Sequence, residues 1–275
     1  MSWHAYMMQI IKAVLKTEEV EIYSEVEVGK LPLKIDMVVQ CKKCIRAERK
    51  ELKSLIKQIK KWAIVELKFA NESLTIGKIL KMIAYFALFA ESKNLSLKEL
   101  KEVLPIIITA RKPVKVFRES REEGYTIEKL EVKGFYRLNL LIPLMIVVIN
   151  ELPLTEEFLP LLLFARGEKL EETLRFILKT ENKLFISWSY ILYQKELMKM
   201  AKAIGKGLDR ISLNVRETIM ELGIRNVIND IGLKEVIKEV GLKEVIKAVG
   251  AEEIAREIDA DVLKKVLKEK EIENN

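Results

Sequence analysis

Three polar side chains interrupt two short apolar segments that have the pattern of β-strands. Asp36 lies within residues 33–39, and Glu66 and Lys68 lie within residues 62–69. Because successive strand residues point to opposite faces, Glu66 and Lys68 share a face, and Asp36 can join them if the strands are neighbours. Two carboxylates and an amine on one sheet surface suit a hard divalent cation such as Mg²⁺. Such a site could support metal-assisted hydrolysis of a phosphodiester bond.

The elements that must position these residues follow a helix and strand order. The pattern predicts an opening helix at residues 3–16 and a half-exposed strand at 20–28, both before the two polar strands. A long helix is predicted after them, at residues 74–91. We expect Asn71-Glu72-Ser73 to cap the long helix, and Gly77 to let it approach the sheet closely. Later strands are expected at 105–110, 125–138 (a hairpin or irregular strand) and 145–150, with a charged loop at 111–123. Beyond residue 154 the pattern predicts helices at 156–165, 169–179, 183–203 and 213–222.

This order resembles the PD-(D/E)XK nuclease superfamily, and within it the recombination-promoting nucleases related to transposase-associated proteins. The resemblance rests on Asp36 and on Glu66-Leu67-Lys68. Glu-x-Lys occurs repeatedly in the chain, and Glu131-Val132-Lys133 is the nearest competitor, but only the copy at Glu66 follows a strand that carries an Asp. The resemblance implies an α/β, restriction-endonuclease-like fold in residues 1–165, with a mixed central sheet flanked by helices. Residues 166–275 would form an all-helical C-terminal region.

The resemblance also implies roles for these residues. Asp36 and Glu66 would bind Mg²⁺, which Mn²⁺ could replace, and the backbone carbonyl of Leu67 would be a further ligand. Lys68 would position the attacking water or stabilise the oxyanion. The alternative is that Glu66 and Lys68 form an ion pair at a sheet edge.

Two features of the resembled family are only partly matched. Many relatives carry Gln-x-x-x-Tyr on the helix after the Glu-x-Lys strand, and here Lys81 replaces the Gln while Tyr85 is retained. Tyr85 could equally be an ordinary half-buried aromatic residue. Many relatives also have an acid on the opening helix, where this chain has none. Gln9, His4 or Glu25 could substitute for it.

Basic residues are concentrated between the two polar strands. Residues 42–61 contain nine basic and two acidic residues, a net charge of +7 that equals the excess of the whole chain. An apolar stripe at Leu52, Leu55, Ile56 and Ile59 predicts a helix there. Lys53 and Lys57 on this helix would contact phosphates beside the site, and Lys78 and Lys81 would add to that surface. The alternative is a solvated basic face.

Histidine and cysteine usage narrows the chemistry further. His4 is the only histidine, which argues against histidine-based triads and multi-histidine zinc sites. Cys41 and Cys44 form half of a zinc-ribbon pattern and could bind zinc, form a disulfide or be idle. No glycine-rich phosphate loop supports nucleotide hydrolysis.

A nine-residue repeat occupies residues 222–266. Nine residues advance about 2.5 turns of a continuous helix, so no single apolar stripe could form. A Gly at the second position of the first four units indicates short helices broken by turns. Such units would stack on each other or on a partner, and DNA binding by this tail is the less favoured reading.

Taken together, these patterns predict a magnesium-dependent DNA endonuclease that acts as a homo-oligomer, with a dimer as the simplest case. We expect a cytoplasmic protein without a membrane segment, because no secretory signal or apolar stretch of about 20 residues is present. Abundant Lys and Glu with few Gln is typical of thermophile proteins. The alternatives are an inactive nucleic-acid-binding protein on a nuclease fold and an oligomeric assembly protein.

Overall fold

The computed structural model describes residues 3–15, 20–27, 34–42, 50–68, 72–180 and 182–203. Residues 2–180 form one compact unit, and the chain from residue 181 onward belongs to a second unit. The described part of the second unit contains one helix, α8 (Lys183–Ala203), with a kink at Tyr193. The helix expected at 213–222 and the repeats of 222–266 lie outside the described residues.

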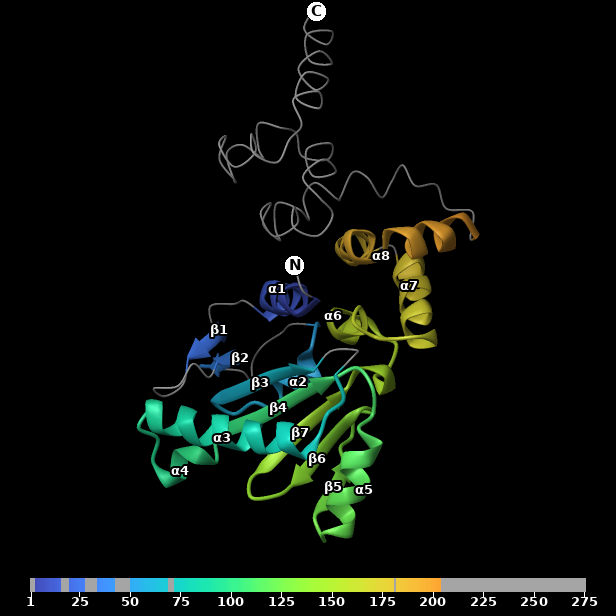
Figure 1. Cartoon of the computed structure of the whole chain (residues 1–275). Helices are drawn as coiled ribbons and strands as arrows, with labels where there is room; N and C mark the ends of the chain where they lie inside the picture. The colour runs from blue at the N-terminus through green and yellow to red at the C-terminus, as the bar shows by residue number, and fades with distance from the viewer. Residues whose placement is uncertain are drawn as a thin grey trace, which may run out of the picture. The chain divides into compact units, whose positions relative to one another are not determined.

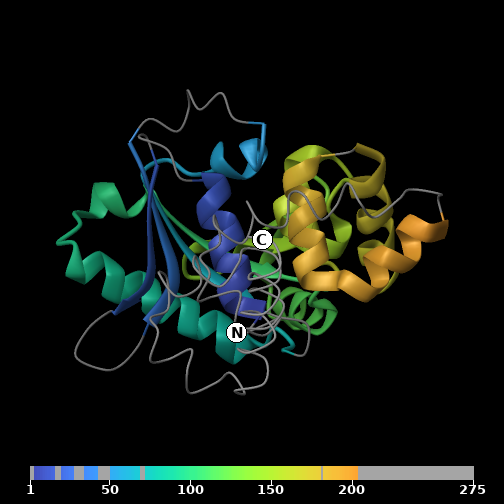
Figure 2. The same cartoon turned by 90° about the horizontal axis from the view of Figure 1, so that it is seen from above.

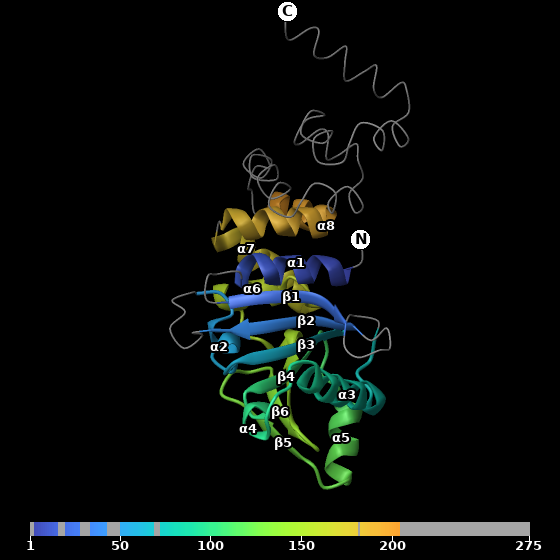
Figure 3. The same cartoon turned by 90° about the vertical axis from the view of Figure 1, so that its left-hand side faces the viewer.

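One mixed seven-stranded sheet forms the centre of the first unit (Figure 1). Its spatial order is β1-β2-β3-β4-β7-β6-β5, and Figure 3 shows β1, β2 and β3 side by side in this order. The central strands β3, β4 and β7 are parallel, and the outer strands pair antiparallel on both sides. The bounds are β1 (Val20–Glu27), β2 (Lys34–Cys41), β3 (Trp62–Lys68), β4 (Val103–Thr109), β5 (Thr126–Lys129), β6 (Phe135–Asn139) and β7 (Pro143–Val148). The predicted α/β class with a mixed sheet is confirmed.

Helices flank this sheet on both faces, and Figure 2 shows α1 and α3 on opposite sides of the strands. Because both faces are covered, β3 is buried along its whole length except at its last residue, Lys68. The α-helices of this unit are α1 (Trp3–Leu15), α2 (Lys53–Ile56), α3 (Ile76–Ser92), α4 (Leu97–Leu100), α5 (Val114–Glu122), α6 (Leu159–Leu162) and α7 (Glu168–Thr180). Two 3₁₀ helices, η2 (Ile149–Glu151) and η3 (Glu156–Phe158), lie between β7 and α6.

The face of β3 that meets α3 also carries the polar residues of interest. Trp62 and Ile64 belong to the same buried apolar cluster as Ile79 and Phe89 of α3. The rings of Trp62 and Phe89 meet edge to face, with centroids 5.4 Å apart. Since side chains alternate along a strand, Glu66 and Lys68 continue the row begun by Trp62 and Ile64. Helix α3 therefore lies over the face on which Glu66 projects.

One sequence-based expectation about helices was wrong, and another was confirmed only as a much shorter helix. The charged loop expected at residues 111–123 contains α5, because Val116, Phe117 and Ser120 form a narrow buried stripe that the surrounding charges obscure. The helix expected within 42–61 is a single turn, α2, preceded by Leu52 with a positive φ of 50°. Its apolar stripe is nevertheless buried, at Leu52, Leu55, Ile56 and Ile59.

The start of α3 also differs from the expectation. Thr75 is the N-cap, and its hydroxyl accepts a hydrogen bond from the backbone N–H of Lys78. The predicted cap at residues 71–73 was therefore placed too early. Gly77 does not provide a close approach, because a Cβ there would meet only the Thr75 hydroxyl, 3.9 Å away.

Candidate functional site

Asp36 and Glu66 lie on neighbouring strands at the same level of the sheet. Strand β2 pairs antiparallel with β3, and Met37 is opposite Val65. One residue further along, the same register sets Asp36 opposite Glu66. The backbone N–H of Leu67 donates a hydrogen bond to Asp36 Oδ2 at 2.8 Å. The two carboxylates therefore share one face of the sheet, where β2 begins and β3 ends.

Glu66 is a buried carboxylate with one oxygen unused. Its exposed fraction is 4%. Its Oε1 accepts a hydrogen bond from Lys68 Nζ at 2.6 Å, while Oε2 is buried and has no hydrogen-bond partner among the described residues. Burial raises the pKa of Glu66, and the nearby charge of Asp36 raises it further, against the opposing effect of Lys68. The unused oxygen is the kind of atom that a bound cation or a donor from a ligand would satisfy.

Lys68 and Lys81 place positive charge against this carboxylate. The side chain of Lys68 is 9% exposed, and Lys81 Nζ reaches to 3.7 Å from Glu66 Oε1. Strand β3 is an interior strand, so the expected alternative of an ion pair at a sheet edge is wrong about the location. The ion pair itself is present, and it is nearly dehydrated.

Tyr85 lies in the core, and its ring packs against the ammonium group of Lys81. It is 2% exposed on α3, and Lys81 Nζ is 4.9 Å from the centre of its ring. The hydroxyl of Tyr85 raises the pKa of Lys81 through a hydrogen bond, and the charges of Glu66 and Asp36 act in the same direction. Tyr85 is therefore fully buried, where the sequence suggested a half-buried aromatic residue, and its contact with the site passes through Lys81.

Glu72 is a site residue that the sequence analysis missed. Its Oε2 is 2.9 Å from Lys78 Nζ and 3.9 Å from Lys68 Nζ. The hydrogen bond from Lys78 lowers the pKa of Glu72, while the charge of Asp36 acts weakly in the opposite direction. The sequence pattern predicts a cap of α3 at residues 71–73 and gives Glu72 no part in the site. The position of Glu72, just after β3 and four residues beyond Lys68, was the available signal.

Lys53 and Lys57 are not beside the two carboxylates. Both are exposed, Lys53 at the start of α2 and Lys57 just after its end, in the connection that leaves β2 at Cys41 and enters β3 at Trp62. Glu66 lies four residues further along β3, a distance of about 13 Å for an extended strand. The antiparallel pairing therefore places the described part of this connection, residues 50–61, toward the opposite end of these strands. Lys53 and Lys57 are therefore not where the sequence-based expectation put them, and residues 43–49 of the segment lie outside the described residues.

The substitutes considered for a helix acid have different positions. Gln9 is half-buried on α1, and the side chain of His4 is outside the described set. Glu25 lies between Ser24, which is opposite Met37, and Val26, which is opposite Ile35. It is thus at the level of Asp36, but its positive φ of 50° interrupts the ladder there.

The competing motif and the cysteines lie elsewhere. Glu131 is exposed in the connection between β5 and β6. Cys41 is disulfide-bonded, which favours the disulfide among the three alternatives, and Cys44 is outside the described residues. Over the described residues, no group of three or more His, Cys, Asp and Glu side chains is arranged to hold a metal.

The donors at Asp36 and Glu66 nevertheless fit a magnesium ion. Mg²⁺ in proteins is commonly held by one or two carboxylates and keeps several waters, so a third protein side chain is not required. The unpartnered Oε2 of Glu66 is an available ligand atom on the face shared with Asp36.

None of the helices in the described part of the chain combines the length and apolar character that crossing a membrane requires. Comparisons of the chain with protein-family models, with curated proteins and with solved structures found no match. The case for a function therefore rests on the site itself.

Proposed function

We propose that the protein is a metal-dependent DNA endonuclease with a restriction-endonuclease-like core, which hydrolyses phosphodiester bonds with Mg²⁺ or Mn²⁺. The observation that carries the proposal is Glu66 Oε2, which is buried and has no hydrogen-bond partner among the described residues. Glu66 lies on the face shared with Asp36, and its Oε1 accepts a hydrogen bond from Lys68 Nζ. Burying a carboxylate oxygen without a hydrogen bond costs free energy, and such groups are concentrated at functional sites, where a ligand can satisfy them.

Asp36 and Glu66 would hold the metal, together with the backbone carbonyl of Leu67. A bound divalent cation supplies polarisation of the scissile phosphate and lowers the pKa of coordinated water. Lys68 presents an ammonium group in a nearly dehydrated position, where it can stabilise negative charge that develops on the phosphate. Its hydrogen bond to Glu66 and the nearby Glu72 fix the direction of that group.

Positive charge around these residues supports a polyanionic substrate. Lys78 and Lys81 stand on the helix over this face. Phosphate contacts by such cations provide binding that does not depend on sequence. Lys53 and Lys57 would extend the contact only if the DNA ran the length of β3. The expected homo-oligomer depends on the repeats, and it stays a prediction.

The test is cleavage of supercoiled plasmid by the full chain with Mg²⁺, with Mn²⁺ or with EDTA. We expect metal-dependent nicking by the wild type, and none by Asp36→Asn. Glu131→Gln is the matched control, because it alters the competing Glu-x-Lys copy on an exposed connection, and it should cut normally. Wild-type protein that is folded but cuts no substrate would overturn the proposal.

The second candidate is a nucleic-acid-binding protein without catalysis. It is favoured by the Glu66–Lys68 hydrogen bond, which could serve stability alone. This candidate predicts DNA binding that is insensitive to metal ions and to Asp36→Asn.

A further inference from the structure

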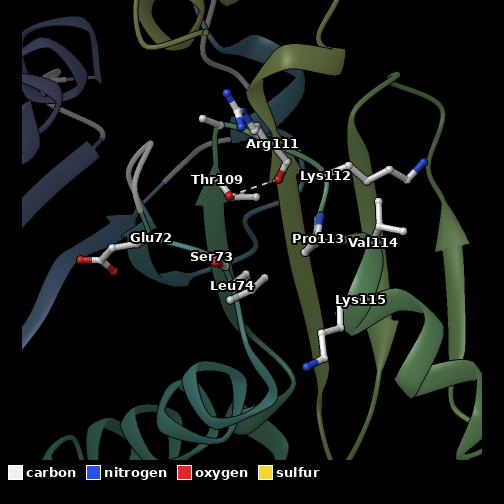
Figure 4. A pocket seen from close by; sticks show the side chains of 10 residues that line it. Glu72, Ser73, Leu74, Thr109, Arg111, Lys112, Pro113, Val114 and Lys115 are labelled. Atoms are coloured by element: carbon white, nitrogen blue, oxygen red, sulfur yellow. Dashed lines mark hydrogen bonds between the residues drawn. The ribbon is translucent and has the colours of Figure 1, made fainter.

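A pocket of about 260 Å³ opens at the end of β4, beside the candidate site (Figure 4). Its walls come from the segment before α3 and from the connection between β4 and α5. The lining residues are Glu72, Ser73, Leu74, Thr109, Ala110, Arg111, Lys112, Pro113, Val114 and Lys115. This volume lies below the range of roughly 300–1,000 Å³ that is usual for drug-sized ligands, so it suits a small group.

The sheet register ties the pocket to the candidate site. Lys68 is opposite Thr109 in the parallel pair of β3 and β4, and Glu66 is opposite Ile107. Thr109 therefore lies on the same face as Glu66, two residues further along the neighbouring strand, where two residues span about 6.6 Å. Glu72 lines the pocket and also reaches Lys68 at 3.9 Å.

The lining has more positive than negative charge. It contains three cations, Arg111, Lys112 and Lys115, against one carboxylate, Glu72. The charge of Glu72 is already offset by Lys78 at 2.9 Å. Lys112 and Lys115 are likewise paired, with Glu151 and Glu119, so the positive charge that an entering anion would meet without a counter-charge is that of Arg111.

Among the three cations that line the pocket, Lys112 and Lys115 are paired with carboxylates, and Arg111 is not paired with any described residue. Lys112 is 3.3 Å from Glu151 and lies over the ring of Tyr136, and Lys115 is 3.7 Å from Glu119. The exposed guanidinium of Arg111 makes no ion pair with any residue in the described ranges. Its backbone is held, because its carbonyl accepts a hydrogen bond from the Thr109 hydroxyl at 3.3 Å.

We propose that this pocket binds a backbone phosphate of the nucleic acid strand next to the phosphate that is cut, with Arg111 as the principal contact. The proposal rests on the proposed function. A guanidinium can donate two parallel hydrogen bonds to a phosphate. The pocket then fixes the strand so that its neighbouring phosphate lies over Asp36 and Glu66.

The test compares Arg111→Ala with Arg118→Ala. Arg118 is a matched control, because it is exposed on α5 and does not line the pocket. Binding to a fluorescent oligonucleotide is measured in EDTA, so that no cutting occurs, and kcat and KM are measured with Mg²⁺. For Arg111→Ala we expect about tenfold weaker binding and a salt slope smaller by about 1, with KM raised and kcat nearly unchanged. Arg118→Ala should match the wild type, and Arg111→Lys should fall between.

Single neutral methylphosphonates along the oligonucleotide locate the contact. At one position next to the cut, a methylphosphonate should weaken wild-type binding as much as the Arg111→Ala substitution does with the unmodified oligonucleotide. Binding of the Arg111→Ala variant to that modified oligonucleotide should be no weaker than either single change makes it. Additive losses at every position would overturn the assignment. So would saturable binding of inorganic phosphate that Arg111→Ala removes while oligonucleotide binding is unchanged, because the pocket would then serve free phosphate.

These readouts separate the two proposals. If the wild type binds the oligonucleotide but cuts nothing, the nuclease proposal fails while the pocket is still tested by binding. If the wild type cuts and Arg111→Ala behaves like Arg118→Ala in every assay, the pocket proposal alone fails.

Discussion

The two ends of strand β3 carry the same pair of residue types in opposite surroundings. At its last residues, Glu66 and Lys68 are hydrogen-bonded at 2.6 Å, with side chains 5% and 9% exposed. Just before its first residue, Lys61 lies 3.2 Å from Glu99 of α4, with side chains 42% and 39% exposed. One pair is nearly dry and the other is in water.

This difference in exposure shifts the pKa values of the two carboxylates in opposite directions. Burial raises the pKa of Glu66. The pKa of Glu99 is lowered to about 2, first by the backbone N–H and the hydroxyl of Ser96 and then by Lys61. All the bonding needs of an exposed carboxylate can be met by water, whereas Glu66 keeps a buried oxygen unsatisfied. Dehydration, and not the presence of Glu and Lys together, distinguishes a candidate site from a surface ion pair.

The largest expected difference concerns metal binding. Glu66→Gln should remove saturable Mn²⁺ binding, measured by calorimetry, and reduce plasmid cleavage to background, because a ligand oxygen is lost. Glu99→Gln should change neither. Equal Mn²⁺ binding by wild type and Glu66→Gln would show that the buried carboxylate is structural.

The second difference concerns the two lysines. Lys68→Met should cost roughly 3 kcal/mol of unfolding free energy, because it leaves a buried carboxylate without its closest partner. It should also lower the cleavage rate by about 10²–10³-fold if Lys68 stabilises developing charge. Lys61→Met should leave both quantities within error, as expected for an exposed pair. Urea unfolding and single-turnover cleavage provide the measurements, and similar losses in the two variants would break the comparison.

A smaller effect is expected at the cap of α3, the helix that holds Lys81 over Glu66. Thr75→Ala removes the hydroxyl that accepts from the N–H of Lys78, and should cost about 1 kcal/mol of stability. The fold and the pairing of Lys81 with Glu66 should persist. Thermal and urea unfolding would measure the loss, and an unchanged stability would mean that water replaces the cap.

The smallest effect concerns the pH dependence at the exposed end. Because the folded pKa of Glu99 lies below its ordinary value of 4.5, ionised Glu99 stabilises the fold above that pH. The contribution is lost as the pH falls from 4.5 toward about 2. Ser96→Ala removes the hydroxyl of the capping box and should move the pKa of Glu99 back toward 4.5. NMR titration of the Glu99 carboxyl carbon tests this, and an unmoved pKa would assign the shift to Lys61 and the Ser96 backbone instead.

Local sequence patterns were enough to predict the strands and most of the helices of the described chain. Alternation along β1, the apolar runs of β3 and β4, and the helical spacing in α1, α3 and α7 are local signals of burial on one or both faces. They also predicted that Asp36, Glu66 and Lys68 would share a face if their strands were neighbours. The short helix α5 was missed because its buried stripe is narrow and its other residues are charged.

Which charged side chains meet depends on the three-dimensional packing of the elements. The antiparallel pairing of β2 with β3 placed Lys53 and Lys57 toward the far end of the strands from Glu66, which no local pattern reveals. The same structure brought Glu72 to Lys68, and set Arg111 beside the site through the parallel pairing of β3 with β4. Burial of Glu66 is likewise a property of the covered sheet, because solvent access depends on every element packed around a side chain and not on its neighbours in sequence.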